Sequence, residues 1–283
     1  MTQLRLAVIA AMALFAGAVQ AGQRDFDINV LSTRADAVSG GDAVIEVRAP
    51  RYASLANLVV RLNGADVTSQ LSADTAGRRL VGLVSGLREG KNRLTVGARY
   101  QHGNQHYESL TVTNHPQSGG IFAPHQRPWI CESEASGLGA PPASGPCVVP
   151  TRYEWFYRTT GGAFQPLPGG ALPADVAKTT TTDGNTVNYI VRVESGTINE
   201  SIYRIAILDD PTAPIANPWS PGGRKPGPGW NGKLSYPFGG GCGPAYRSGR
   251  NVVTNALSHD PLSLGFAVGS WKGAPRGSRR AAS

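Results

Sequence analysis

The chain has 283 residues, of which 40% are hydrophobic, and a formal net charge of +8. This hydrophobic content excludes an intrinsically disordered chain, and 36 glycines with 21 prolines favour a protein rich in strands and turns. Much of the excess charge comes from Arg5 and from the basic residues of 272–283, so the body between them is close to neutral. Because the body carries no stripe of basic residues interleaved with aromatic ones, we predict no nucleic-acid partner.

The first 21 residues have the features of a secretory signal peptide. Arg5 precedes an apolar run over 6–19, and the segment ends in Ala-Val-Gln-Ala. The run is shorter than the roughly 20 apolar residues that a membrane-spanning helix requires. We therefore predict an exported protein, periplasmic or extracellular, with no membrane span.

Residues 22–116 have the pattern of an all-β domain. Short runs with alternating apolar side chains recur at the spacing of an immunoglobulin-like sandwich. Asn63-Gly64 is the strongest hairpin signal in this segment. His102 and His106 flank a turn between strands rather than one helix face, so we predict no metal site there. The strands expected in this domain cover 28–31, 43–47, 58–62, 80–84, 93–96, 98–100 and 107–113.

Residues 117–229 read as a Gly/Pro-rich linker followed by a β-hairpin that opens a second domain. Cys131 and Cys147 lie in an irregular loop of the linker, and two nearby cysteines in an exported chain most simply form a disulfide. Closing a loop of ~15 residues contributes about 3 kcal/mol on the chain-entropy argument. Cys242 is then the odd cysteine, either a functional nucleophile or a thiol whose partner lies in another chain.

The second domain begins with strands predicted over 187–193 and 202–208, joined as an antiparallel hairpin. A further strand over 233–238, a helix over 248–257 and a strand over 263–270 follow. A hairpin, a strand that ends in glycines, a helix and another strand are the order in which an α/β-hydrolase sheet begins.

A glycine cluster follows the strand predicted over 233–238. Without Cβ atoms, its backbone N–H groups can approach a ligand oxygen closely, as in an oxyanion hole. A tight surface turn is the alternative interpretation. A phosphate cradle is disfavoured, because Pro244 stands where a P-loop opens a helix with Lys and Ser or Thr. The members of the cluster are Gly239, Gly240, Gly241, Cys242 and Gly243.

Trp230-Asn231-Gly232-Lys233 together with this cluster resembles the corresponding strand of secreted bacterial hydrolases related to tannases and 3-hydroxybutyrate-oligomer hydrolases. The longer arrangement, including 151–157 and 189–194, is similar to one family catalogued only as a domain of unknown function. The resemblance covers nearly all of the mature chain to about Val268. It implies a β-sandwich followed by an α/β-hydrolase domain that cleaves carboxylic esters or related acyl bonds, with residues 239–243 as the oxyanion loop.

The sequence departs from such hydrolases at the catalytic residues. None of its serines has Gly both two residues before and two residues after, so the Gly-x-Ser-x-Gly nucleophile elbow is missing. His259 and Asp260 are chain neighbours and cannot adopt the base and orienter geometry of a triad, so we interpret them as a helix-ending turn. Residues 230–270 are therefore interpreted as the start of an incomplete, C-terminally truncated hydrolase core, and 271–283 as an aberrant basic tail.

Two functions of different class follow. The first is an exported acyl hydrolase whose relatives cleave an ester or polymer-derived small molecule, while this chain lacks the triad and is inactive. The second is an exported β-sandwich module that binds a polymer or a cell surface. A third reading makes Cys242 a thiol nucleophile, but no positioned base is evident. No cofactor is expected, and the acyl substrate and the oligomeric state stay open.

Overall fold

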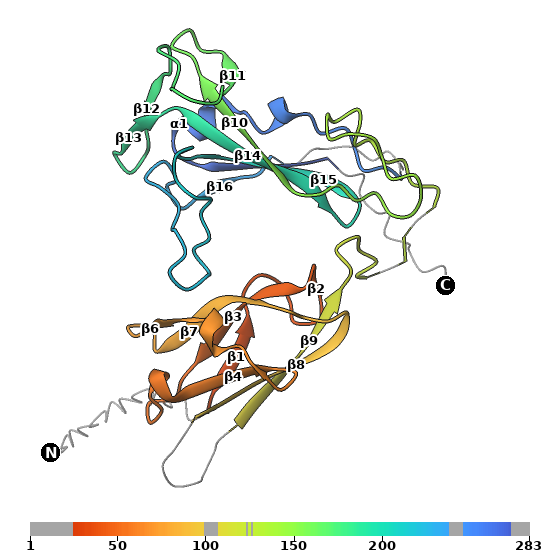
Figure 1. The fold of residues 1–283 in the computed structure, drawn as a ribbon, viewed down its shortest axis with the longest axis vertical. Coiled ribbons are helices and arrows are strands. Elements are labelled where there is room, and N and C mark those ends of the chain that lie inside the picture. Colours follow the sequence, from red (N-terminus) through yellow and green to blue (C-terminus); the bar gives the residue numbers. More distant parts are fainter. Residues whose placement is uncertain (1–24, 99–106, 123, 126, 238–245, 273–283) are drawn as a thin grey trace, which may run out of the picture.

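The computed structural model describes residues 25–98, 107–122, 124–125, 127–237 and 246–272. Strands make up 40% of the structure and helices 6%, and they form two lobes (Figure 1). The first lobe holds strands β1 to β9 and the second holds β10 to β17. The predicted signal peptide, residues 1–21, lies outside the described residues.

The first lobe consists of two sheets. One has the order β1-β3-β7-β6 and is antiparallel throughout, and the other has the order β2-β9-β8-β4-β5, in which only the pair β2 and β9 is parallel. The strands of the first sheet are β1 (Asp27–Val30), β3 (Asp42–Arg48), β7 (Arg79–Ser85) and β6 (Ser72–Asp74). Those of the second are β2 (Val38–Ser39), β9 (Tyr107–His115), β8 (Gly90–Ala98), β4 (Leu58–Leu62) and β5 (Ala65–Asp66).

Alternate side chains of both sheets meet in one core. Ile45 and Val47 of β3 are fully buried together with Val60 of β4 and Leu94 of β8. The period-2 pattern of the sequence is therefore explained, because successive residues of a strand point to opposite faces. The Asn63-Gly64 hairpin is confirmed: both residues have positive φ, 51° and 90°, and connect β4 to β5 as a two-residue turn requires.

The second lobe is built on a six-stranded sheet with the order β11-β10-β14-β15-β17-β16. Its pairs are antiparallel except for β16 and β17, which run parallel. The strands are β10 (Arg152–Arg158), β11 (Phe164–Pro166), β14 (Ile190–Ile198), β15 (Ser201–Leu208), β16 (Leu234–Ser235) and β17 (Ala267–Lys272), and a separate hairpin pairs β12 (Lys178–Thr180) with β13 (Thr186–Asn188). β17 extends through the first two residues of the segment predicted as a basic tail.

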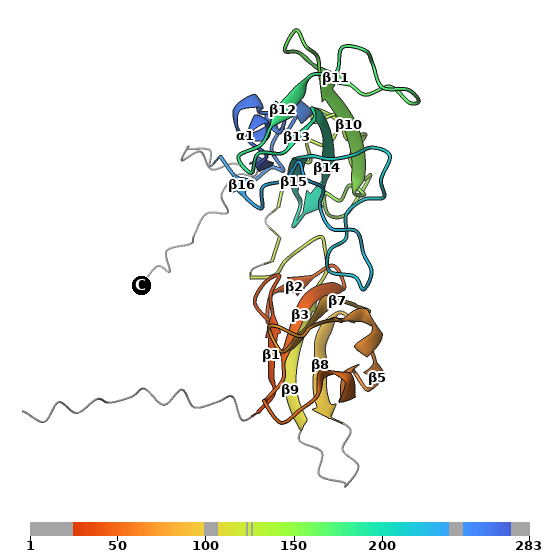
Figure 2. The same cartoon turned by 90° about the vertical axis from the view of Figure 1, so that its left-hand side faces the viewer.

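The two faces of this sheet differ in burial. On one face Ala206, Leu208 and Val268 form a core with Ala256 and Leu262, which come from the segment around α1 (His259–Ser263). Figure 2 shows α1 against one side of the sheet. Several side chains of the opposite face are more than a third exposed, namely Tyr153, Ile205, Leu234 and Trp271.

The helix predicted over 248–257 is wrong. The structure has a single 3-10 turn at Val253–Asn255 and places the helix at 259–263. The backbone N–H of Ser248 donates to the carbonyl oxygen of Ile130 and that of Asn251 to Ser136 Oγ, instead of to helical partners. His259 and Asp260 therefore begin a helix and do not end one.

The irregular segment before β10 is held by the disulfide that the sequence predicts. Cys131 and Cys147 are joined, with their Cα atoms 5.4 Å apart. The backbone N–H of Cys147 donates a 3.0 Å hydrogen bond to buried Glu200, which lies in the turn between β14 and β15, and Val149 N–H donates to Thr197 Oγ1 at 2.8 Å. The disulfide loop thus packs on the tip of the central hairpin.

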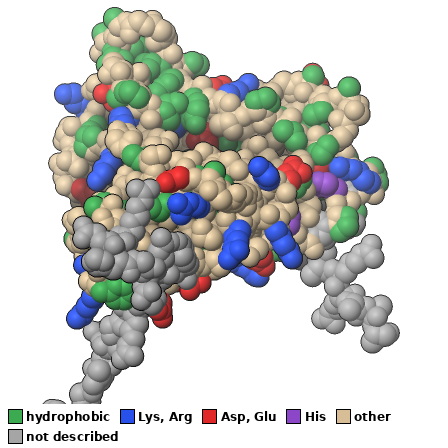
Figure 3. Space-filling model, turned by 60° about the horizontal axis from the view of Figure 1, so that its bottom comes forward, with side chains coloured by type: hydrophobic (Ala, Val, Ile, Leu, Met, Phe, Trp, Pro, Cys, Tyr) green, Lys and Arg blue, Asp and Glu red, His purple; other side chains and the backbone are tan. Residues whose placement is uncertain are grey.

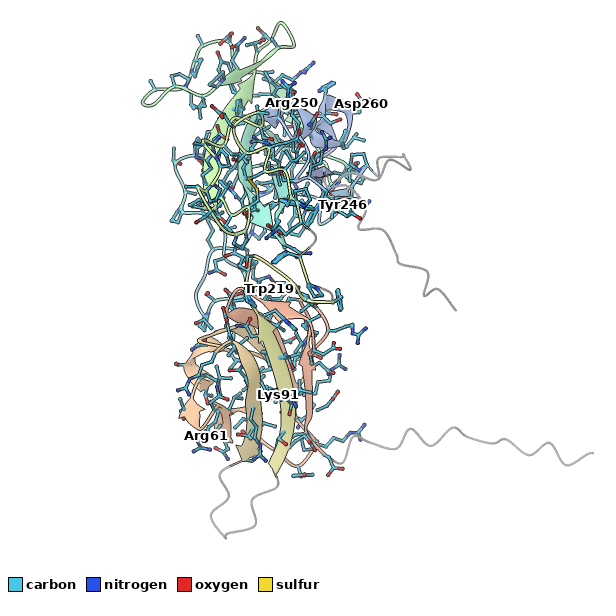
Figure 4. The ribbon with its side chains drawn as sticks, turned by 90° about the vertical axis from the view of Figure 1, so that its right-hand side faces the viewer. Arg61, Lys91, Trp219, Tyr246, Arg250 and Asp260 are labelled. Atoms are coloured by element: carbon cyan, nitrogen blue, oxygen red, sulfur yellow. A yellow bond between two sulfur atoms is a disulfide. The ribbon has the colours of Figure 1, made fainter. Side chains whose placement is uncertain are left out.

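A long connection between β15 and β16 reaches back to the first lobe. The N–H of Leu83 in β7 donates a 3.0 Å hydrogen bond to the carbonyl oxygen of Trp219. This N–H is accessible because β6 pairs with β7 only as far as Val81. Figure 4 shows Trp219 at the junction of the lobes.

Candidate active site

The parallel pair β16 and β17 marks the candidate site. Leu234 pairs with Ala267 and Ser235 with Val268, so the carboxyl ends of both strands lie at the same edge of the sheet. In open sheets with parallel strands, ligands bind at that edge. The predicted oxyanion loop, residues 239–243, follows β16 in the sequence, and all five residues lie outside the described part of the chain.

The Trp230-Asn231-Gly232-Lys233 motif positions the start of β16. Asn231 N–H donates to the carbonyl oxygen of Gly265 at 2.9 Å, and its side-chain amide donates to that of Leu264 at 2.9 Å. Its Oδ1 accepts the N–H of Lys233 at 3.0 Å. Gly232 has a φ of 77°, which suits the tight turn. The motif therefore acts by fixing the strand against the residues that follow α1.

An aromatic side chain covers the carboxyl end of β16. A Cβ placed on Gly269 of β17 would lie 2.9 Å from Cδ2 of Tyr236, so the Tyr236 ring rests directly on the β17 backbone. Tyr236 is 37% exposed. The glycine in β17 is thus required for the close approach of the ring.

A buried arginine supports β17 from the core face. Arg204 of β15 lies opposite Ser270 of β17 and is 1% exposed. Its Nε donates to the carbonyl oxygen of Asn251 at 2.8 Å, its Nη1 to Ser195 Oγ at 2.7 Å and its Nη2 to the carbonyl oxygen of Ser136 at 2.6 Å. Burial lowers the pKa of the Arg204 guanidinium, while Glu154 near its Nη1 acts in the opposite sense.

Asn251 completes this network. Its side-chain amide donates to the carbonyl oxygens of Ile202 at 3.2 Å and Ser270 at 3.0 Å, so it connects β15 and β17. Its Oδ1 accepts from Ser270 Oγ at 3.0 Å. The sequence analysis did not predict that Arg204 and Asn251 share one buried hydrogen-bond network. An arginine at a core-facing position of an apolar strand could have indicated it, because a buried charge needs hydrogen-bond partners.

His259 does not pair with Asp260. Its Nδ1 lies 3.2 Å from the hydroxyl oxygen of Tyr189, which also donates to the His259 carbonyl oxygen at 3.1 Å. Burial raises the pKa of Tyr189, so the phenol stays protonated. Tyr189 directly precedes β14, at the amino end of the parallel direction, and the pair therefore lies away from the candidate edge.

Among the predicted cysteine sites, the disulfide between Cys131 and Cys147 is confirmed, and Cys242 lies outside the described residues.

Within the ranges that the structure describes, no three His, Cys, Asp or Glu side chains come together as a metal site would need. None of the described helices has the length and apolar content needed to cross a bilayer. On the face shown in Figure 3, Lys and Arg side chains lie interspersed with Asp and Glu side chains.

Comparison with protein-family models gives a match over most of the chain. A family model described as a tannase-like family of unknown function (DUF6351) matches residues 28–274 and thus spans both lobes. A comparison with curated proteins found no match. The family relation suggests a function of the hydrolase type. With almost the whole sequence matched, the chain belongs to the tannase-like family of unknown function.

Proposed function

We propose that the second lobe is the opening part of an α/β-hydrolase core and that family members cleave carboxylic esters or related acyl bonds at the carboxyl ends of β16 and β17. The observation that carries the proposal is the sheet order β14-β15-β17-β16. β14 and β15 form an antiparallel hairpin. The next strand in the chain, β16, lies at the edge of the sheet, and β17, which follows α1 in the chain, lies between β15 and β16.

The position of the glycine cluster supports this assignment. In α/β-hydrolases, one N–H of the oxyanion hole comes from the loop between the third strand and the following helix. Residues 239–243 follow β16, the third of these strands, and precede α1. Their role in the proposal is to donate backbone hydrogen bonds to the oxygen that becomes negative when an ester carbonyl is attacked.

We also propose that this chain does not itself turn over esters. An oxyanion loop accelerates a reaction only when a nucleophile forms the bond that creates the negative charge. The sequence has no Gly-x-Ser-x-Gly elbow, and His259 pairs with Tyr189 instead of with an acid. A nucleophile and its base would therefore have to be supplied by residues other than the expected ones.

The domain division and the export are also part of the proposal. It assigns residues 1–21 to a signal peptide, 22–116 to an immunoglobulin-like sandwich, 117–229 to the linker and hairpin, and 230–270 to the hydrolase core, before the basic tail 271–283. The sheet orders β1-β3-β7-β6 and β2-β9-β8-β4-β5 support the immunoglobulin-like assignment, since they match ABED and a G-F-C sheet. A disulfide is compatible with an exported protein.

An ester panel tests the proposal. Short-chain p-nitrophenyl esters, gallate esters and hydroxybutyrate oligomers are assayed with the wild-type chain and with Cys242→Ala. The expected result is no turnover above buffer. Saturable turnover that disappears in Cys242→Ala would make this chain a thiol hydrolase, and turnover that survives the substitution would show a nucleophile elsewhere in the chain.

One observation favours the second candidate, a polymer-binding sandwich. A groove of about 630 Å³ on the first lobe is lined by Arg51, Tyr52 and Arg78. Tyr52 is 51% exposed, and an exposed aromatic ring in a groove that two arginines also line suits a sugar polymer that carries acidic groups. Pull-down by an insoluble acidic polysaccharide, lost in Tyr52→Ala of the full chain, would favour this function, and equal retention of both proteins would remove the support of the groove.

A further inference from the structure

A second cavity lies at the opposite edge of the six-stranded sheet from the candidate active site. It is found where β14 begins and β15 ends and has a volume of about 290 Å³. Small-molecule sites span roughly 300–1,000 Å³ and are mostly apolar with a few polar groups. The apolar wall consists of Leu172, Val187, Ile190, Leu208, Pro211 and Pro228.

Hydrogen bonds and close packing hold one side of this cavity in place. Asp209 is 3% exposed at its side chain and accepts hydrogen bonds from Arg192 Nε at 2.9 Å and Arg224 Nη2 at 2.8 Å. Arg224 also donates to the carbonyl oxygen of Pro214, so these bonds close the base of the long loop that lines one side. On the same side, a Cβ added to Gly229 would lie 2.7 Å from Cβ of Leu208, which means that the loop backbone packs directly on β15.

Asp210 adds an exposed carboxylate to the lining of the cavity. Both oxygens of the neighbouring Asp209 are occupied by the two arginines, whereas Asp210 is exposed and its Oδ1 accepts from the N–H and Oγ1 of Thr212 at 2.9 and 2.7 Å. These hydrogen bonds from Thr212 lower the pKa of Asp210, so its carboxylate is ionised near neutral pH. An apolar cavity with an oriented carboxylate in its lining favours a cationic head group and disfavours an anionic one.

We propose that this cavity binds a small molecule with an aromatic or branched aliphatic body and a primary ammonium head. The body packs against Ile190, Leu208 and Leu172, and the ammonium group donates to the carboxylate of Asp210. The site is separate from the ester-cleaving edge, because Leu208 is the last residue of β15 and β15 runs antiparallel to β17. The inference therefore stands independently of the proposed hydrolase function.

Three probes that share one ring and differ in the head group test the site on the full chain. Binding of 2-phenylethylamine, 2-phenylethanol and phenylacetate is measured by ligand-observed NMR and calorimetry at neutral pH. The amine should bind saturably, the alcohol about fivefold more weakly, as the loss of one partly exposed ion pair predicts, and phenylacetate more weakly again. Equal binding of the three probes, or no saturable binding of the amine, would overturn the proposal.

Two variants locate the binding. Asp210→Asn keeps an oxygen that accepts from Thr212 but removes the charge, so the preference for the amine over the alcohol should disappear. Leu172→Trp fills the cavity from a wall position that is 44% exposed and should weaken the amine at least about tenfold. The matched control is Leu31→Trp at a position of the first lobe that is 47% exposed, and it should bind like the wild type. An amine affinity unchanged in Leu172→Trp would mean that the probe binds elsewhere.

Discussion

Nε of Arg204 donates a 2.8 Å hydrogen bond to the carbonyl oxygen of Asn251. The bond joins the centre of β15 to the segment that leads from the glycine cluster to α1. Three further acceptors, from Ser195, Ser136 and Glu154, surround the same guanidinium. The second lobe is thus organised around a buried cation, with the disulfide loop and the connection between β16 and β17 both attached to it.

Replacing this cation should destabilise the second lobe. Arg204→Leu leaves the carbonyl oxygens of Ser136 and Asn251 buried without this donor, and we expect a loss of about 3–5 kcal/mol of unfolding free energy. Urea unfolding followed by tryptophan fluorescence measures it. Arg250→Leu is the matched control, because Arg250 is exposed on the same segment (Figure 4) and should change stability by less than about 0.5 kcal/mol. Equal stability of the two variants would contradict a structural role for Arg204.

The pH dependence of stability should depend on Asp209. Burial raises the pKa of this carboxyl, but hydrogen bonds from Arg224 and Arg192 outweigh burial and hold it below its usual value. A carboxyl with a lowered pKa in the folded state stabilises the protein above the unfolded-state pKa of about 3.9, and this contribution is lost as the pH falls through the folded-state pKa.

Asp209→Asn should therefore lower stability at pH 7 and flatten the stability profile between pH 5 and the acid limit. Urea midpoints measured from pH 7 down to pH 3 test this expectation. Asp183→Asn, at an exposed position in the turn between β12 and β13, serves as the control and should keep the wild-type slope. The same slope in Asp209→Asn and in the wild type would show that the Arg192 and Arg224 pairs contribute no pH-dependent stability.

Local sequence signals predicted some strands closely and the long-range connections poorly. The strand expected over 187–193 lies at Ile190–Ile198, the strand expected over 263–270 begins only at Ala267, and β10 to β13 were not predicted. Alternating side chains predicted β3, β4 and β15 within one or two residues, and Asn63-Gly64 predicted the hairpin, because these features act between near neighbours. The helix expected over 248–257 does not form, because its backbone and Asn251 bond to residues more than 100 positions away. The two ion pairs of Asp209 were not predicted for the same reason, because Arg192 and Arg224 contact Asp209 only in the folded lobe.

The oxyanion loop is predicted from the sequence alone, because residues 239–243 lie outside the described part of the chain. Five consecutive residues with four glycines indicate close backbone approach, but not what they approach. The parallel pairing of β16 with β17 and the packing of Tyr236 on Gly269 come from the structure, and no spacing rule indicates either of them. Side-chain contacts across a sheet depend on register, which the sequence of one strand does not contain.

Cysteine chemistry gives a further prediction. Because Cys131 and Cys147 form a disulfide, thiol labelling of the unfolded but unreduced chain should modify only the peptide with Cys242, and labelling after reduction should modify all three cysteines. Replacing both linked cysteines by Ala should cost about 2–5 kcal/mol. Peptide mapping is the measurement. A peptide in which Cys242 is linked to Cys131 or to Cys147 would contradict the pairing.

Gly265, in the turn before β17, and Gly184, in the turn between β12 and β13, have similar positive φ values. Replacing each of them by Ala distinguishes the cost of backbone strain from the cost of steric crowding. Gly265 has a φ of 88°, and a Cβ there would lie 2.9 Å from Thr181 side-chain atoms and 3.0 Å from the carbonyl oxygen of Gly229. Gly184 has a φ of 82°, but a Cβ there would meet no atom within 4 Å. Gly184→Ala should therefore cost only the left-handed backbone penalty of about 1–2 kcal/mol. Gly265→Ala should cost about 1–3 kcal/mol more, because Thr181 and the Gly229 carbonyl must move. The free energies of unfolding in urea should differ between the two variants by that amount. Equal losses of unfolding free energy would mean that the turn before β17 relaxes without strain.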